Sequence, residues 1–400
     1  MRVVIVGAGQ AGAWVVQRLR ANDPDCVITL VGEEPWAPYE RPPLSKASFV
    51  TDDSAPRFIL SVEQAAKLNV SLLLGTTVVQ IDRARKCAVT RGHGELAYDK
   101  LVLATGGSAR RLQVPGHDLP GVCYLRTWED ATQLRGRLNR ARTLLVVGGG
   151  WIGLEVAASA RMLGCNVVLV ESSERLCART VPPWVSGYLA RQHELRGVTV
   201  KLSCEVSKIE LSTEGGLVAH TSDGALDADL IAVGVGLQPN IGLAAACGLE
   251  VANGILVDAF GGTSDPDIYA CGDVANQPLA TSGERIRIES YANAINHAVT
   301  VADHLSGRPQ DGKDVPWFWS DQFDFQLQVL GYPSGDGEWV TRGDEGQGKF
   351  CLFQIQGGVL QSVISVNMAR ELKLAKRWMK AGVCPPAHVL RDLTVRLDKV

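Results

Sequence analysis

Two stretches of this chain run from an apolar strand straight into a glycine-rich turn, and this feature limits the folds open to it. The first spans residues 2–12 (RVVIVGAGQAG), where Gly7, Gly9 and Gly12 have G-x-G-x-x-G spacing. In such a turn the first glycine permits a tight bend, the second admits a pyrophosphate, and the third lets helix and strand pack closely. The free N–H groups at the helix start then bind the phosphates. The segment therefore predicts a dinucleotide site.

An acidic residue follows the next expected strand at the offset that a dinucleotide-binding unit requires. The strand over residues 27–31 (VITLV) is followed by Gly32-Glu33-Glu34, about 20 positions after Gly12. A carboxylate at this point accepts hydrogen bonds from ribose hydroxyls. Either Glu33 or Glu34 is expected to supply it.

The same device recurs in the middle of the chain. Residues 143–155 (TLLVVGGGWIGLE) again lead from a buried strand into G-x-G-x-x-G, with glycines at Gly148, Gly150 and Gly153. A helix over residues 156–163 is expected to follow. Two such turns predict a protein that binds two dinucleotides.

The acid after the second turn predicts which nicotinamide cofactor is used. The strand over residues 166–170 ends at Glu171, again about 20 positions past the last glycine. A carboxylate there accepts hydrogen bonds from both ribose hydroxyls and repels a 2′-phosphate, so NAD is favoured over NADP. Arg175 would weaken this preference, but it lies too far along the chain.

A proline-rich segment follows the first acid. Residues 35–43 (PWAPYERPP) contain four prolines, which exclude the interior of a regular helix and a central strand. We interpret the segment as a rigid loop that displays Arg41 and Lys46. It is either a solvated connector or a loop that reaches the reactive end of a cofactor, and its place just past the acid favours the second.

Further segments predict strands whose carboxyl ends meet a ligand. Residues 100–107 (KLVLATGG) form one, ending at Thr105 and Gly106. A short strand before Gly272-Asp273 is a second, and Asp273 either caps the following helix or binds a ligand. Residues 226–236 are expected to form a single strand.

The composition limits the function classes. The chain has 400 residues, 46% of them hydrophobic, and a net charge of −3, which points to no nucleic-acid or membrane partner. Its ten cysteines contain no C-x-x-C, and no metal site is expected. The first strand starts at residue 2 and no apolar run is long enough to span a bilayer, so we expect a cytoplasmic protein without a signal peptide.

Several of these segments together carry a family resemblance along essentially the whole chain. They are the two glycine turns, residues 38–46 (PYERPPLSK), 104–106 (ATG), 272–274 (GDV) and 316–322 (PWFWSDQ). The chain resembles the FAD-dependent pyridine-nucleotide reductases, and within them the ferredoxin reductase components of bacterial ring-hydroxylating dioxygenase systems, of the 3-phenylpropionate and biphenyl dioxygenase type.

The resemblance implies an α/β fold of the glutathione-reductase type. It would contain two Rossmann-like dinucleotide-binding domains and a C-terminal α+β domain. The implied boundaries are residues 1–107 and 242–314 for a discontinuous FAD domain, 108–241 for the NAD domain, and 315–400 for the C-terminal domain.

The resemblance also implies the site residues. Those for FAD are Gly7, Gly9, Gly12, Glu33 or Glu34, Arg41, Lys46, Thr105, Gly106, Asp273, Trp319 and Ser320. Those for NAD are Gly148, Gly150, Ile152, Gly153, Glu155, Glu171 and Glu289. Lys46 would lie beside the flavin, paired with Glu155, while Trp319 and Ser320 would close over the isoalloxazine. Tyr291 stands where the family usually has tryptophan.

The implied activity is that of an NADH:ferredoxin oxidoreductase. NADH would pass a hydride to FAD, which would release single electrons to a [2Fe–2S] ferredoxin serving an aromatic ring-hydroxylating dioxygenase. No nucleophile is required, and residues 41–46 lack the cysteine of thiol-dependent sister enzymes. The alternatives are a reductase of a P450 or rubredoxin chain and an NADH-sensing flavoprotein resembling apoptosis-inducing factor. The oligomeric state, a homodimer included, stays open.

A basic stripe near the C-terminus is a candidate ferredoxin-docking surface. Residues 369–380 are expected to form a helix, on which Lys373, Lys376, Arg377 and Lys380 share one face. This face is either an ordinary solvated one or a surface that steers an acidic ferredoxin.

Overall fold

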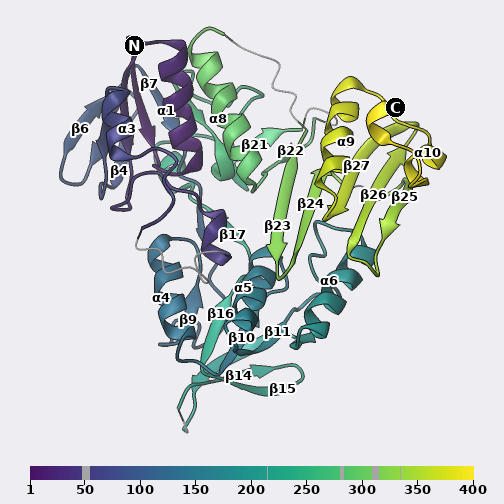
Figure 1. Cartoon of the computed structure of the whole chain (residues 1–400). Helices are drawn as coiled ribbons and strands as arrows, with labels where there is room; N and C mark the ends of the chain where they lie inside the picture. The colour runs from purple at the N-terminus through teal and green to yellow at the C-terminus, as the bar shows by residue number, and fades with distance from the viewer. Residues whose placement is uncertain (47–54, 214, 280–282, 309–314, 334) are drawn as a thin grey trace. The chain divides into compact units, whose positions relative to one another are not determined.

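The computed structural model describes residues 1–46, 55–213, 215–279, 283–308, 315–333 and 335–400 (Figure 1). The chain divides into two units. The first unit comprises Met1–Arg41, Ala55–Ser108 and Gln238–Asp314. The second comprises Pro42–Ser54, Ala109–Leu237 and Val315–Val400. Each unit is described by itself.

A five-stranded parallel sheet forms the centre of the first unit. Its strand order is β20 (Ile268–Ala270), β7 (Lys100–Leu103), β1 (Arg2–Val6), β2 (Val27–Val31) and β3 (Val70–Leu73). A parallel sheet covered on both faces requires nearly continuous apolar strands, and β1 is buried from its second residue onward. The strands expected over residues 2–6 and 27–31 are confirmed, whereas the one expected over residues 100–107 ends earlier, at Leu103.

Two helices pack against each other in the first unit, α1 (Gln10–Asn22) and α8 (Tyr291–Leu305) (Figure 1). Both contribute buried apolar side chains to one cluster with β1 and β2. At their edge, Arg18 of α1 donates from Nε and Nη2 to the carboxylate of Asp303 of α8, at 2.5 and 2.9 Å. This bidentate pair links the two ends of the unit's sequence.

Shorter elements complete the first unit and its junctions. The elements within it are α3 (Val62–Lys67), α7 (Gly242–Ala246), η2 (Gly272–Val274), β4 (Val78–Asp82), β5 (Cys87–Thr90), β6 (Gly94–Ala97), β18 (Val251–Ala252), β19 (Gly254–Leu256), β21 (Ala275–Pro278) and β22 (Arg285–Ile286). Two short strands lie where the chain crosses between the units, β8 (Gly107–Ala109) and β17 (Leu237–Pro239).

The second unit begins with another five-stranded parallel sheet. Its order is β12 (Val198–Lys201), β11 (Asn166–Val170), β10 (Thr143–Val147), β16 (Leu230–Val233) and β9 (Val122–Tyr124). The helices that accompany it are α4 (Trp128–Leu138), α5 (Trp151–Met162) and α6 (Pro183–Leu195). The other elements are η1 (Pro42–Ser45), β13 (Val206–Leu211), β14 (Leu217–Thr221) and β15 (Gly224–Ala228).

The C-terminal part of the second unit is an antiparallel sheet. Its order is β23 (Trp317–Gln322), β24 (Phe325–Gly331), β27 (Val359–Val366), β26 (Lys349–Gln356) and β25 (Glu338–Asp344). One face packs under α9 (Ala369–Ala381), α10 (Ala387–Arg391) and η3 (Leu397–Lys399), while Phe350 on the other face packs against Tyr188 of α6. Helix α6 is therefore shared between the two five-stranded sheets of the unit.

One sequence expectation about strands is wrong. Residues 226–236 form parts of two strands, β15 and β16, instead of one. The break falls at Asp229, whose carboxylate accepts the backbone N–H groups of Arg142 (2.7 Å) and Thr143 (2.9 Å) at the start of β10. Two hydrogen bonds to a distant strand therefore hold Asp229 between β15 and β16, and the local sequence does not reveal them.

We expect the Gly12→Ala variant to lose stability. A Cβ at Gly12 would lie 2.0 Å from the carbonyl oxygen of Gly7, so α1 would have to move away from β1. Such overpacking typically costs about 1–3 kcal/mol. Chemical unfolding followed by circular dichroism measures it. The control is Gly9→Ala, where an added methyl meets nothing within 4 Å; equal losses in both variants would contradict the packing role.

Candidate cofactor sites

The first glycine turn leaves the N-terminus of α1 open to a phosphate. Gly7 has φ +114°, a conformation that glycine adopts without strain. Gly9 is the N-cap of α1, and no side chain among the described residues caps the helix there. The first backbone N–H groups of α1 are thus available to an anion, and the open space at the Cβ position of Gly9 lets one approach. These features fit a dinucleotide.

The structure separates the two acids that follow β2. Glu34 accepts hydrogen bonds from Arg41 Nη2 and Tyr39 OH, both at 2.5 Å, whereas Glu33 is exposed. Burial opposes the charge of Arg41, but Tyr39, Glu34 and Asp273 outweigh it and raise the pKa of the guanidinium. Arg41 is therefore held within its own unit by Glu34, and its expected role in binding FAD stays a prediction. Glu33 is the more accessible acid.

The carboxyl ends of β7 and β20 lie side by side because these strands pair in parallel. After β7, Thr105 Oγ1 donates to the carbonyl of Asn240, and Asn240 Nδ2 donates to the carbonyl of Thr105, both at 2.9 Å. After β20, Cys271 is the N-cap of η2, so Asp273 does not cap a helix. The capping interpretation of Asp273 is therefore wrong for η2, and its binding of a ligand stays a prediction.

Glu289 lies in the first unit, apart in sequence and unit from the other residues assigned to NAD. Its carboxylate accepts a hydrogen bond from Arg287 Nη1 at 2.5 Å. Tyr291, which departs from the tryptophan that the resemblance implied at this position, begins α8 and donates its hydroxyl to Glu40 Oε1 at 3.2 Å. The tyrosine thus gains a polar contact that an indole ring could not make in the same way.

The second glycine turn repeats the geometry of the first. Gly148 has φ +109°, and a Cβ at Gly153 would lie 2.0 Å from the Gly148 carbonyl. Gly150 is the N-cap of α5 and has nothing within 4 Å of its Cβ position. The start of α5 is therefore a second place where backbone N–H groups can receive a phosphate.

The acid of the second turn is fixed by backbone hydrogen bonds. Glu171 Oε2 accepts the N–H of Gly149 at 2.6 Å, and Oε1 accepts the N–H of Ser173 at 2.7 Å. Arg175 donates from Nη1 to the Val181 carbonyl at 2.8 Å and makes further bonds around it. The guanidinium is thus occupied within the fold, which supports the expectation that it does not receive a 2′-phosphate.

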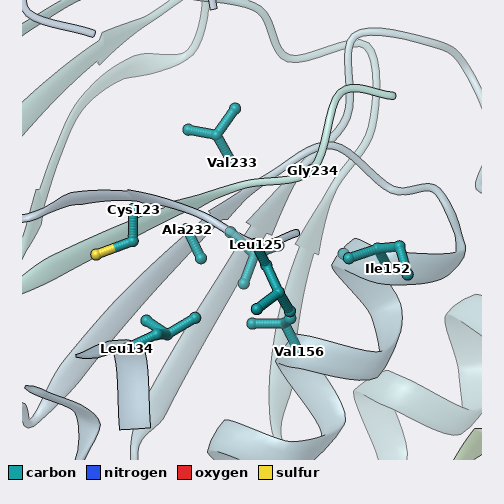
Figure 2. A pocket seen from close by; sticks show the side chains of 10 residues that line it. Cys123, Leu125, Leu134, Ile152, Val156, Ala232, Val233 and Gly234 are labelled. Carbon is teal, nitrogen blue, oxygen red and sulfur yellow. The ribbon is translucent and has the colours of Figure 1, made fainter. Parts of the chain in front are cut away.

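A small hollow lies beside the second glycine turn (Figure 2). Its lining is apolar and includes the labelled side chains of Cys123, Leu125 and Val156. Ile152 borders it from the first turn of α5 and is itself 46% exposed. The hollow offers packing surface next to the turn, and its lining residues supply no charged group.

A buried carboxylate, Glu155 on α5, is surrounded by hydrogen-bond donors. Its Oε2 accepts from Ser45 Oγ at 2.5 Å and pairs with Lys46 Nζ at 2.9 Å. Its Oε1 accepts from Ser320 Oγ at 2.5 Å. Burial raises the pKa of Glu155, and Lys46 and the two hydroxyls oppose that rise. The pairing of Lys46 with Glu155 that the resemblance implied is present in the second unit.

The two residues expected to cover the flavin point in opposite directions. Trp319 and Ser320 are neighbours on β23, so their side chains lie on opposite faces of the strand. Ser320 is fully buried against Glu155, while Trp319 stacks on Trp317 with ring centroids 4.8 Å apart. Trp319 is therefore partly exposed, whereas the hydroxyl of Ser320 is buried and donates to the carboxylate of Glu155.

The basic stripe lies on the outer face of α9. Lys373, Arg377 and Lys380 are exposed and Lys376 is partly exposed. The opposite face of the helix buries Leu372, Ala375 and Trp378 against the sheet. The structure therefore supports the amphipathic helix that the spacing predicted, while its docking role stays a prediction.

Sequence reasoning missed several polar residues of these sites. Ser45, Gln322 and His193 belong to the hydrogen-bonded surroundings of Glu155, and Tyr39 holds Glu34. Gln322 is the last residue of the segment 316–322, which carries the family resemblance, but nothing in its local sequence indicates a role. His193 stands alone on α6 without a motif, so only the tertiary structure identifies it.

The described ranges contain neither a cluster of side chains suited to a metal ion nor a helix suited to spanning a membrane. All ten cysteines are unpaired, and no group of His, Cys, Asp or Glu side chains in these ranges is arranged to hold a metal ion. Within the same ranges, none of the helices has the length and apolarity needed to cross a membrane.

Two known protein families match this chain. Residues 1–298 match the family described as pyridine nucleotide-disulphide oxidoreductase, and residues 317–400 match the reductase C-terminal family. The chain belongs to the pyridine nucleotide-disulphide oxidoreductases. The predicted α/β fold class is confirmed.

Individual relatives are similar over the whole chain. The ferredoxin–NAD(+) reductase component of the anthranilate 1,2-dioxygenase system of Burkholderia cepacia is 39% identical over 396 residues, covering 98% of each chain. The crystal structure of the ferredoxin reductase for the CYP199A2 system from Rhodopseudomonas palustris has a TM-score of 0.96 at 36% identity, covering 100% of this chain and 99% of its own. A covalent putidaredoxin reductase–putidaredoxin complex gives 0.93 at 36%, covering 100% and 97%.

The geometry around Glu171 leads to a prediction about cofactor choice. We expect Glu171→Gln to lower the ratio of kcat/KM for NADH to kcat/KM for NADPH by about tenfold, because a charge-assisted hydrogen bond and a repulsive charge are lost. Steady-state kinetics with both cofactors measures the ratio. The matched control is Glu174→Gln, which removes an exposed charge three positions away. An equal change in both variants would contradict a local role for Glu171.

Proposed function

We propose that this protein is an FAD-dependent NADH:ferredoxin oxidoreductase that supplies a [2Fe–2S] ferredoxin of an aromatic ring-hydroxylating dioxygenase system. The observation that carries the proposal is the pair of open helix N-termini at Gly9 and Gly150. Each is followed by an acid at the end of the next strand. The similarity to ferredoxin–NAD(+) reductases over nearly the whole chain supports the same activity.

We assign FAD to the first glycine turn and NAD to the second. For FAD, the start of α1 would hold the pyrophosphate and Glu33 the ribose, because Glu34 is occupied by Arg41 and Tyr39. For NAD, the start of α5 and Glu171 would take these roles. When bound, FAD accepts a hydride from NADH and gives up electrons singly, which converts two-electron into one-electron chemistry.

The protein's own groups would hold geometry and charge. Lys46 carries a positive charge, which would stabilise the negative charge of a reduced flavin beside it. The ion pair of Lys46 with Glu155 fixes where that positive charge lies. The described residues around Glu155 include no thiol within its hydrogen-bond network, and the proposed reaction needs no nucleophile. We therefore assign Lys46 and Glu155 an electrostatic role.

The same activity fits two electron-transfer chains. The relative from the anthranilate 1,2-dioxygenase system favours a dioxygenase as the final acceptor. The similar structure from the CYP199A2 system favours a P450-type chain as the second candidate.

We also propose the three domains that the resemblance implied. We further propose a cytoplasmic location, because ten unpaired cysteines fit a reducing compartment.

Anaerobic titration tests the proposed function. We expect NADH to bleach the flavin absorbance of the purified protein, because a bound FAD accepts the hydride, and oxidised [2Fe–2S] ferredoxin to restore it. NADPH should bleach it less effectively. Bleaching that ferredoxin does not reverse would indicate a different acceptor or an NADH sensor, and a colourless protein indifferent to NADH would refute the proposal.

Charge reversal on α9 tests the docking surface. The double variant Lys373→Glu/Arg377→Glu is expected to slow ferredoxin reduction and reduce its dependence on salt, because the steering charge is inverted. Ferricyanide reduction should stay unchanged, since it needs no specific docking. The matched control, Lys67→Glu/Arg91→Glu, makes the same change in net charge at exposed positions elsewhere. Equal effects of the two double variants on ferredoxin reduction would exclude α9.

A further inference from the structure

We infer that His193 and Gln322 are positioning residues that direct the hydroxyl of Ser320 onto Glu155. Both lie outside the residues assigned above to flavin or nicotinamide. The inference rests on the proposed function, because Glu155 matters to the reaction through Lys46. It concerns a line of hydrogen bonds that runs from α6 through β23 to α5, all within the second unit.

Four buried side chains form this line. His193 Nε2 lies 2.9 Å from Gln322 Oε1, Gln322 Nε2 lies 2.9 Å from Ser320 Oγ, and Ser320 Oγ lies 2.5 Å from Glu155 Oε1. Each of the four is at most 2% exposed. Water therefore has little access to these groups, and the hydrogen bonds between them are made in a medium of low polarity.

The chemistry of each group fixes the direction of every bond. Glu155 faces the Lys46 ammonium and two hydroxyls, so its oxygens act as acceptors and take the only proton of Ser320. Ser320 Oγ must then accept from Gln322, which presents its NH2 group and leaves its oxygen toward His193. His193 Nε2 must consequently carry the proton. The line is a one-way series of donors that ends at the carboxylate.

This direction gives His193 a specific task. An amide can turn over about its last bond, and a turned Gln322 would present its oxygen to Ser320 as an acceptor. Ser320 would then have a second acceptor for its single proton, in competition with Glu155. The N–H of His193 binds the Gln322 oxygen and thereby prevents the turn. Loss of that N–H would weaken a donor that stabilises the ionised form of Glu155.

The surroundings of His193 keep it a neutral donor. Burial lowers the pKa of its imidazole to about 4, with Arg196 adding to this effect and Gln322 opposing it. Its Nδ1 is buried without a hydrogen-bond partner among the described residues, so a second proton there would have no acceptor. The ring packs edge-on against Phe323 with centroids 5.1 Å apart, which fixes its orientation.

Two substitutions at one position separate positioning from packing. His193→Met keeps an unbranched side chain of similar size but removes the N–H, whereas His193→Gln supplies an amide N–H in its place. The readout is the pH at which the Glu155 carboxyl becomes protonated, followed by infrared difference spectroscopy of the flavin-loaded protein. Glu155→Gln identifies the band. This measurement does not depend on turnover.

We expect His193→Met to move the protonation of Glu155 to higher pH and His193→Gln to return it toward the wild-type pH. Hydride transfer from NADH in a stopped-flow experiment should slow about threefold to tenfold in His193→Met, the loss expected for one hydrogen bond, and recover in His193→Gln. Unchanged protonation in His193→Met, or equal shifts in both variants, would overturn the inference.

A second site keeps the test decisive if His193→Met does not fold. Gln322→Glu places an acceptor against Ser320 and should raise the pH of Glu155 protonation further, because it also adds a negative charge nearby. No shift in that variant would equally overturn the inference. Failure of the proposed function is distinguishable, since in that case NADH would not reduce the flavin of the wild-type protein at all.

Discussion

The burial of a single carboxylate, Glu155, constrains how the second unit is built. Moving an ion from water into a protein interior costs several kcal/mol unless donors replace the lost water. Here the replacements come from two segments far apart in the sequence: Ser45 and Lys46, which follow the proline-rich loop, and Ser320 from β23. The burial of this carboxylate therefore couples the segment of Ser45 and Lys46 to α5 and to β23 of the C-terminal sheet.

The same physics appears in the two glycine turns, where each glycine solves a different problem. Gly12 and Gly153 lie where a Cβ would strike a backbone carbonyl, so they belong to the packing of helix on strand. Gly9 and Gly150 face open space at the helix N-termini, so a side chain there would meet no protein atom, and the proposed cofactors would approach at these two positions. Glycines that look like one motif in the sequence thus differ in whether the packing of the protein itself requires them.

Most of the fold and part of the site could be predicted, and the failures share a cause. Strands such as β1 and β10 are continuous apolar runs, which a sheet covered on both faces demands. The prediction of a single strand over residues 226–236 was wrong because the carboxylate of Asp229 accepts hydrogen bonds from the backbone at the start of β10. The ion pair of Arg41 with Glu34 was likewise not indicated by the sequence. In both cases a charged side chain makes an interaction that the pattern of polar and apolar residues around it does not predict.

The sequence by itself determined the two dinucleotide turns, the acids that follow them and the family, because backbone geometry and apolar burial act over a few residues and leave a periodic signature. Only the tertiary structure decided which of Glu33 and Glu34 is accessible, which face of β23 carries Ser320, and how His193 on α6 reaches Glu155 through Gln322. Hydrogen bonds between distant segments are short-ranged and directional, so they exist only once the whole fold has brought donor and acceptor together.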